Sequence, residues 1–364
     1  MVKVLLIASL FSGLLITSIT SKYKETKLIG FVLAFIFVYI ISGFVTYTPD
    51  WLGYATLLYK RYYREPFYML VQIVTLKYGY GFKQIQLLFT GLYTLFLIIL
   101  ISKFNKNPFL IVTLFIPIIY LFYATQIRFF LGYYSVCLSL YYFFISKKRV
   151  LALLLLIFGL INHYSLFIIF IFLFFFKYNV RGLFKKVIYV TIALFIVFSI
   201  SNYLYNFILS TNYWFSVYFS KSERSSILGG VFSFMPSILS LILINGYARK
   251  MMNRIPSLFQ DKKFVLLYRL SIVPYVILGI AIYVQVIGQR FIIPALLFQL
   301  LLVFYIARHY NTKKQNFNLI GLTLFYYILY FTFVYILSPI VVGNDITQKV
   351  LLMLNSNSLI GHWF

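Results

Sequence analysis

Long runs of apolar residues without a permanent charge recur along the whole chain, and residues 150–176 form one such run of 27. A helix of about 20 apolar residues spans the roughly 30 Å hydrocarbon core of a bilayer. Because backbone groups in lipid must hydrogen-bond to one another, only helices and closed barrels cross a membrane. Barrel strands alternate polar and apolar residues, and these runs do not. The pattern therefore predicts an all-α polytopic integral membrane protein.

About 12 transmembrane helices are expected within a single polytopic membrane domain, residues 1–364. The first run resembles a signal peptide, but it lacks a strongly basic start and more spans follow, so we interpret it as a retained helix. The predicted runs lie at 4–20, 28–48, 84–102, 108–125, 129–146, 150–162, 164–176, 187–207, 231–248, 264–288, 291–307 and 317–342.

Basic residues greatly outnumber acidic ones, with 32 Lys and Arg against six Asp and Glu and a formal net charge of +26. In a soluble protein this excess would suggest a nucleic-acid partner. Here the bases gather in short connections between apolar runs, which is the positive-inside pattern, so we expect no nucleic acid. Placing the six most basic connections in the cytoplasm puts both termini outside. The outer loops are then predicted at about 49–82, 208–230 and 343–364.

Two segments must enter and leave the membrane from the same side on this map. Residues 66–82 are expected to form a re-entrant or interfacial outer segment. The run at 150–176 has basic connections on both sides, which predicts a short helical hairpin turning at Asn162 and His163. Each half of this hairpin would be about 20 Å long, which is less than a full span.

His163 lies in the middle of this apolar run, directly after Asn162. Ionisable side chains inside membranes are energetically costly and usually face a cavity or a pathway. His163 is therefore a candidate catalytic base, proton relay or hydrogen-bond donor to an oxygen-rich ligand. The alternative is a neutral imidazole that is hydrogen-bonded to Asn162 or to another helix. We count Asn162 among the substrate-binding candidates.

Two arginines follow glutamines at junctions where one predicted span meets the next almost without a loop. These pairs are Gln126 with Arg128, and Gln289 with Arg290, and both are expected at the outer side. A guanidinium is a planar, permanently charged fork that matches phosphate oxygens. The two junctions together could clamp a diphosphate. The alternative is that both arginines reach the lipid headgroups from within the membrane.

The first outer loop carries the richest set of polar candidates. Asp50 and Tyr54 lie four residues apart, and Arg64 precedes Glu65 and Pro66. Proline after an acidic residue is typical of a helix start, so we expect Pro66 to be the first helical residue. The acids could orient sugar hydroxyls or accept a proton from an acceptor hydroxyl. The alternative is a loop that is held together by its own ion pairs.

Several kinds of site are not indicated by the sequence. It contains no phosphate-binding glycine-rich loop, no His/Cys metal spacing and no G-x-S-x-G nucleophile turn. The few acids are too scattered for a paired-carboxylate metal site, so we expect neither a metal nor a cofactor. A small charged cluster in the second outer loop adds Arg224 as a weaker substrate-binding candidate.

Four short motifs follow one another in an order that resembles the EpsG-type branch of Wzy-like polysaccharide polymerases, which build capsule and exopolysaccharide. The resemblance covers roughly residues 45–170, and the polytopic layout extends it over the whole chain. The matching residues are Asp50 and Tyr54; Glu65, Pro66 and Phe67; Ile127 and Arg128; and His163, Ser165 and Leu166.

The resemblance implies glycosyl transfer on the outer face of the cytoplasmic membrane, without a metal. The substrates would be oligosaccharide repeat units on undecaprenyl diphosphate, and the partners a flippase and a chain-length regulator of the same pathway. The growing chain would leave its lipid carrier and join the next unit. His163, Asp50 and Glu65 are then the catalytic candidates, and Arg128 and Arg290 would bind the diphosphate leaving group.

Two other functions stay open at this point. A transporter or flippase of lipid-linked saccharides would also need basic cavities, but its charged residues should be spread over several helices near the membrane centre. A membrane O-acyltransferase would use an intramembrane histidine too, but it would need access to a cytoplasmic acyl donor. The gathering of polar candidates on one side favours the polymerase.

Overall fold

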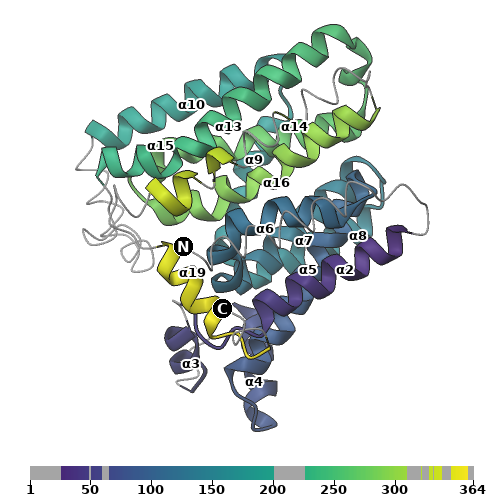
Figure 1. Cartoon of the computed structure of the whole chain (residues 1–364). Helices are drawn as coiled ribbons and strands as arrows, with labels where there is room; N and C mark the ends of the chain where they lie inside the picture. The colour runs from purple at the N-terminus through teal and green to yellow at the C-terminus, as the bar shows by residue number, and fades with distance from the viewer. Residues whose placement is uncertain are drawn as a thin grey trace. The chain divides into compact units, whose positions relative to one another are not determined.

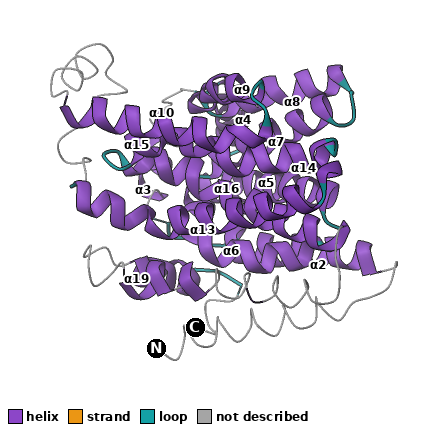
Figure 2. Ribbon diagram, turned by 90° about the horizontal axis from the view of Figure 1, so that it is seen from above, coloured by secondary structure: helices purple, strands orange, loops and turns teal. Residues whose placement is uncertain are grey.

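A computed structural model describes residues 26–48, 51–59, 65–200, 226–309, 321, 328–330, 332–337 and 346–359. Within these ranges the chain consists of helices and connecting loops (Figure 2), and a lone antiparallel bridge joins Val45 to Asn357. Seven of the described helices are long and apolar enough to cross a membrane, and three shorter apolar helices accompany them. The prediction of an all-α polytopic membrane protein is confirmed, and the count of 12 stays a prediction. The run at 4–20 and most of the run at 317–342 lie outside the described residues.

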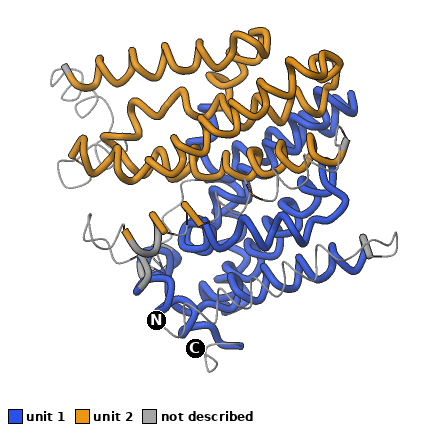
Figure 3. Tube along the Cα trace, turned by 45° about the horizontal axis from the view of Figure 1, so that its top comes forward, with its two compact units in different colours: residues 1–168, 344–364 blue, residues 169–343 orange. Residues whose placement is uncertain are grey.

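The chain divides into two compact units (Figure 3), residues 1–168 with 344–364, and residues 169–343. Both consist of apolar helices, and the single membrane domain stays a prediction. The described elements of unit 1 (Figure 1) are α2 (Thr26–Gly43), α3 (Trp51–Tyr59), α4 (Pro66–Lys77), α5 (Phe82–Phe104), α6 (Pro108–Thr125), α7 (Ile127–Phe144), α8 (Arg149–Asn162), the 3-10 helix η1 (Tyr164–Ile168) and α19 (Ile346–Asn355).

Local sequence explains where several helices of unit 1 begin. Pro108 is the first residue of α6, and the Asn107 side chain caps it by accepting a hydrogen bond from the Leu110 amide at 3.2 Å. Helix α6 therefore occupies the predicted run at 108–125. Likewise, Pro66 opens α4 after Glu65, as predicted.

Helix α4 has an unusual distribution of side chains. Its buried residues are Tyr68, Gln72 and Thr75, which are polar, whereas Leu70 and Ile73 on the other side are apolar and exposed. A helix with its apolar side outward is suited to contact with lipid rather than water. At 12 residues it is too short to span a bilayer. These features agree with an interfacial helix, while the re-entrant path of residues 66–82 stays a prediction.

Helices α7 and α8 approach each other closely because two glycines face one another. A Cβ on Gly132 would lie 2.7 Å from the carbonyl oxygen of Gly159, and a Cβ on Gly159 would lie 2.6 Å from Val136 Cγ2. Ser135 and Ser139 on α7 also donate hydrogen bonds to backbone carbonyls of α8, both at 2.7 Å. Small residues and interhelical hydrogen bonds are how helices associate in lipid. This contact places the end of α8 beside the start of α7.

The α-helix of the long apolar run is interrupted at His163, where the sequence predicted a turn. His163 has an extended backbone, with φ −157° and ψ 114°, and ends α8. The next residues form the short 3-10 helix η1, which packs on α7 and α8. Because the following helix belongs to unit 2, the antiparallel hairpin stays a prediction.

The described elements of unit 2 are α9 (Ile169–Phe176), α10 (Val180–Ile200), α13 (Ile227–Arg254), the 3-10 helix η2 (Pro256–Phe259), α14 (Lys262–Ile272), the 3-10 helix η3 (Val273–Ile277), α15 (Leu278–Ala281), α16 (Gln285–His309) and the π-helical segment η4 (Thr332–Leu337). The basic connection expected between the runs at 164–176 and 187–207 is largely the start of α10 rather than a loop. The predicted run at 264–288 corresponds to a candidate span at Lys262–Ala281, in which the 3-10 helix η3, with Pro274 as its second residue, lies between α14 and α15.

Candidate functional site

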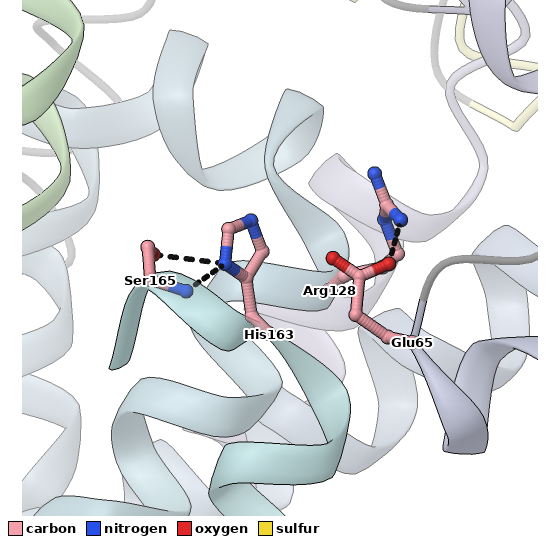
Figure 4. Close-up of polar contacts among 4 residues, drawn as sticks. All are labelled: Glu65, Arg128, His163 and Ser165. Atoms are coloured by element: carbon pink, nitrogen blue, oxygen red, sulfur yellow. Dashed lines mark hydrogen bonds and ion pairs between the residues drawn. The ribbon is translucent and has the colours of Figure 1, made fainter. Parts of the chain in front are cut away.

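Glu65 and Arg128 form an ion pair that joins the start of α4 to the first turn of α7 (Figure 4). One guanidinium nitrogen, Nη1, donates to the carboxylate oxygen Oε2. The Arg128 side chain is 15% exposed and that of Glu65 is 7% exposed. The sequence analysis gave the two residues separate roles, whereas the structure brings them into direct contact. Removing either partner would leave the other charge buried and unpaired, which is strongly destabilising.

Two tyrosine rings flank the guanidinium of Arg128. The centre of the guanidinium lies 5.1 Å from the ring centroid of Tyr54 and 4.8 Å from that of Tyr68. Both distances are within the range of cation–π attraction. Tyr54 is held in turn by stacking on Phe82 at 5.3 Å, and Tyr68 contacts Phe89 edge to face at 5.7 Å. The rings therefore hold the charged group in place while shielding it from solvent.

Tyr68 was not among the site residues predicted from the sequence, although its spacing from Glu65 could have indicated it. It stands three residues after Glu65 on a helix whose start was predicted, so the two share a face of α4. Burial raises the pKa of the Tyr68 phenol, and the nearby Tyr54 raises it further. The phenol is thus neutral at physiological pH, which makes Tyr68 a group that positions Arg128 rather than a base.

Several buried side-chain atoms at or beside this pair have no hydrogen-bond partner among the described residues. They are Nε of Arg128, Oε1 of Gln126, the Tyr68 hydroxyl and both amide atoms of Gln72. Gln126 is the single residue between α6 and α7, as the almost loop-free junction predicted. Buried polar atoms normally have hydrogen-bond partners. Their presence at a charged site is therefore consistent with groups that bind a ligand.

His163 interacts with Ser165 two residues later (Figure 4). Its Nδ1 accepts a hydrogen bond from the Ser165 amide at 3.3 Å and lies 2.8 Å from the Ser165 hydroxyl oxygen. Because an amide N–H only donates, Nδ1 must present a lone pair, which assigns the proton of the neutral ring to Nε2. In this state His163 offers an N–H donor at Nε2. A general base at Nε2 would require the opposite tautomer.

Asn162 and His163 are both buried, with Asn162 completely so. The Asn162 amide nitrogen donates to the Phe158 carbonyl at 2.6 Å, within its own helix. The contact of His163 Nδ1 is with Ser165, and the role of His163 stays a prediction. The Asn162 oxygen Oδ1 has no hydrogen-bond partner in the part of the chain that the structure describes.

The two polar pairs are connected by neighbouring residues of unit 1. Arg128 contacts Glu65, and the next residue, Phe129, contacts the His163 ring edge to face at 5.6 Å. Phe67 of α4 contacts Phe158 of α8 at 5.0 Å. The starts of α4 and α7, the end of α8 and Tyr54 of α3 therefore make up the candidate site, which contains Tyr54, Glu65, Tyr68, Gln126, Arg128, Asn162 and His163.

The remaining candidates lie in unit 2 or outside the described residues. Gln289 and Arg290 lie in unit 2, inside the first turns of α16, and not at a junction between helices as predicted. The chain turns at residues 282–284, and α16 begins at Gln285 after that turn. Three further candidates, Asp50, Arg64 and Arg224, lie outside the described residues.

No group of three His, Cys, Asp or Glu side chains that could hold a metal ion occurs within the described ranges. No curated protein matches the chain, and neither does any solved structure. The model of the EpsG family matches residues 4–344, which is nearly the whole chain. The order of helices, the Glu65–Arg128 pair and the His163 turn described above all fall within the matched region. The chain therefore belongs to the EpsG family, the EpsG-type branch of the Wzy-like polysaccharide polymerases.

Proposed function

We propose that this protein joins oligosaccharide repeat units linked to undecaprenyl diphosphate into capsular or exopolysaccharide chains, on the outer face of the cytoplasmic membrane. The observation that carries the proposal is the buried arginine of α7, held between two tyrosines beside a buried histidine. Ionisable groups at such positions in membrane proteins usually serve function. A flippase and a chain-length regulator would supply the substrate and limit the product.

The reaction needs fixed positive charge where the leaving group develops negative charge. The bond between the anomeric carbon of the growing chain and its diphosphate breaks, and its electron pair stays on the diphosphate. A bond forms from the acceptor hydroxyl oxygen to the anomeric carbon, and the hydroxyl proton passes to a carboxylate. Arg128 can stabilise the diphosphate as a preorganised cation. Glu65 and Asp50 are the carboxylates proposed as proton acceptors.

His163 has a different part in this scheme. With its proton on Nε2, it can donate a hydrogen bond to an oxygen of the diphosphate or of the sugar. Ser165 fixes that tautomer from the other side of the ring. We therefore propose His163 as a hydrogen-bond donor that orients the substrate, and not as the base that the sequence alone also allowed.

The test is a polymerisation assay with the purified protein in nanodiscs, using a lipid-linked repeat unit as the only sugar substrate. A ladder of products with released undecaprenyl diphosphate is expected from the wild type, and none from Arg128→Ala. Arg181→Ala is a matched control, because Arg181 also lies over an aromatic ring, at 4.4 Å from Phe259, but in unit 2. Intact substrate that merely changes leaflet would make the protein a transporter and would remove the catalytic roles.

A further inference from the structure

We propose that Glu65 is a displaceable counter-ion. Its carboxylate occupies the anion position of Arg128 in the substrate-free protein, and the diphosphate of the lipid-linked donor takes that position when it binds. This inference rests on the proposed function and adds a competition between two anions for one guanidinium. It assigns to the site a preference for diphosphate over the single phosphate of an ordinary lipid headgroup.

Glu65 and the Tyr54 hydroxyl interact with the guanidinium of Arg128 and leave part of its binding capacity unused. Arg128 donates to Glu65 from Nη1 to a single carboxylate oxygen, and its buried Nε donates to no acceptor among the described residues. A guanidinium has five N–H donors in a planar fork, which favours two parallel hydrogen bonds to neighbouring oxygens. A diphosphate presents several such oxygens at once. It can therefore satisfy donors that the present contact leaves unpaired.

The ion pair with Arg128 is the contact that holds the Glu65 carboxylate in its present position. It is the residue before the first turn of α4, yet its side chain makes no capping hydrogen bond to that helix. Within the described residues, the contact recorded for its carboxylate is the one with Arg128. Once displaced, the carboxylate can turn toward the amides of Phe67 and Tyr68, which are the positions that an N-cap side chain normally satisfies. The N-terminal amides of α4 thus provide a second hydrogen-bonding position for the displaced Glu65 carboxylate.

The difference in charge between the Glu65 carboxylate and the diphosphate determines which of the two anions stays beside Arg128. The carboxylate carries one negative charge, whereas a diphosphate that links a lipid to a sugar has two ionised phosphates. Like charges repel strongly where little water is present, and the Glu65 side chain is only 7% exposed. Both anions therefore cannot remain beside Arg128 together. Binding of the diphosphate should require that the carboxylate moves away, and a protein without that carboxylate should bind the diphosphate more tightly.

The experiment measures binding of undecaprenyl diphosphate without any acceptor, so that it does not depend on polymerisation. Trp51 is a convenient reporter, since its ring contacts Phe82 at 4.8 Å and Phe82 stacks on Tyr54 beside Arg128. Trp214 and Trp363 are replaced by Phe, and the fluorescence of Trp51 is followed in detergent as the lipid is titrated. Glu65→Gln keeps the size of the side chain and removes the charge. We expect its affinity for undecaprenyl diphosphate to be about tenfold higher. This is the effect expected if the state with the Glu65–Arg128 ion pair is populated about tenfold over the state in which Arg128 can bind the lipid.

Three controls make the result specific. Asp261→Asn removes the charge of the acid that caps α14 in unit 2, and it should leave the affinity unchanged. Undecaprenyl monophosphate should gain less affinity than the diphosphate in Glu65→Gln. Glu65→Asp keeps the charge but shortens the side chain, and a folded Glu65→Asp variant with an affinity above the wild-type value would support the proposal even if Glu65→Gln does not fold.

An affinity of folded Glu65→Gln that equals the wild-type value, or falls below it, would overturn the counter-ion role. A lower affinity would show that Glu65 is needed to hold Arg128 in place, and an equal affinity would show that Glu65 has no influence on diphosphate binding. The proposed function has its own separate outcome: a wild type that forms no polymer would remove the polymerase activity, while the titration would still decide whether the two anions compete.

Discussion

Glu65 and Arg128 are 63 residues apart in the chain, yet they form an ion pair that connects the start of α4 to the start of α7. The pair is shielded by the rings of Tyr54 and Tyr68, so its two charges are mostly removed from water. A charge in this position is held firmly and interacts strongly with any other charge that enters.

Replacing Arg128 by Lys tests the need for a planar fork. Lys keeps the charge but offers a compact ammonium that does not reproduce two parallel hydrogen bonds or stacking between tyrosines. We expect the rate of polymer formation to fall by about 10²-fold, comparable to the loss of one donor that stabilises a developing oxyanion. Arg181→Lys should leave the rate unchanged. Equal rates for Arg128→Lys and wild type would show that positive charge alone is sufficient.

Substitutions of His163 distinguish a donor at Nε2 from one at Nδ1. The amide nitrogen of Gln can take the place of Nε2, and that of Asn can take the place of Nδ1. Because Nδ1 accepts from the Ser165 amide, we expect His163→Gln to retain at least about tenfold more activity than His163→Asn, a difference of one charge-assisted hydrogen bond. The measurement is the initial rate of polymer formation. Greater activity in His163→Asn would reverse the assignment of the ring proton.

The role of Tyr68 depends on its ring and not on its hydroxyl group. Burial keeps the Tyr68 phenol neutral by raising its pKa, so the hydroxyl does not act as a base. Tyr68→Phe should therefore polymerise at a rate within about threefold of the wild type, whereas Tyr68→Leu loses a cation–π contact of about 1–2 kcal/mol. Initial rates and thermal unfolding midpoints of both variants check this. A Tyr68→Phe variant as inactive as Tyr68→Leu would instead assign the hydroxyl a direct role.

The contact between α7 and α8 predicts a strong effect of added volume at Gly159. A Cβ there would lie 2.6 Å from Val136 Cγ2 and 2.9 Å from the Gly132 carbonyl oxygen. Gly159→Ala should destabilise the protein by about 1–3 kcal/mol, as overpacking does. Gly246→Ala on α13 is the matched control, because nothing lies within 4 Å of its Cβ position. The measurement is the midpoint of thermal unfolding of each variant in detergent. Equal midpoints for Gly159→Ala and Gly246→Ala would contradict the close packing of α7 against α8.

The orientation of unit 1 in the membrane can be tested by labelling. Tyr80, in the exposed turn between α4 and α5, is predicted to lie outside, and Lys147, in the turn between α7 and α8, is predicted to lie in the cytoplasm. With the buried Cys137 replaced by Ser, Tyr80→Cys should react with an impermeant maleimide in intact cells. Lys147→Cys should react only after permeabilisation. The opposite pattern would invert the topology and place the site on the cytoplasmic side.

The class of fold was determined by the sequence alone, because long apolar runs in lipid must satisfy their backbone hydrogen bonds internally, as helices do. Helix α6 coincides with its predicted run, and Pro66 opens α4 as expected, since proline and capping residues act within a single turn. The interruption at His163 was also predicted, because a polar residue stands at the centre of an apolar run.

The contacts that make the site were decided by tertiary structure. The pairing of Glu65 with Arg128 depends on how α4 and α7 pack, and the sequence treated the two as independent groups. Tyr68 is part of the site because the polar face of α4 is the buried one. The proton on His163 was assigned only by the position of the Ser165 amide. Local patterns act over a few residues, whereas these contacts arise from the packing of helices that are distant in the chain.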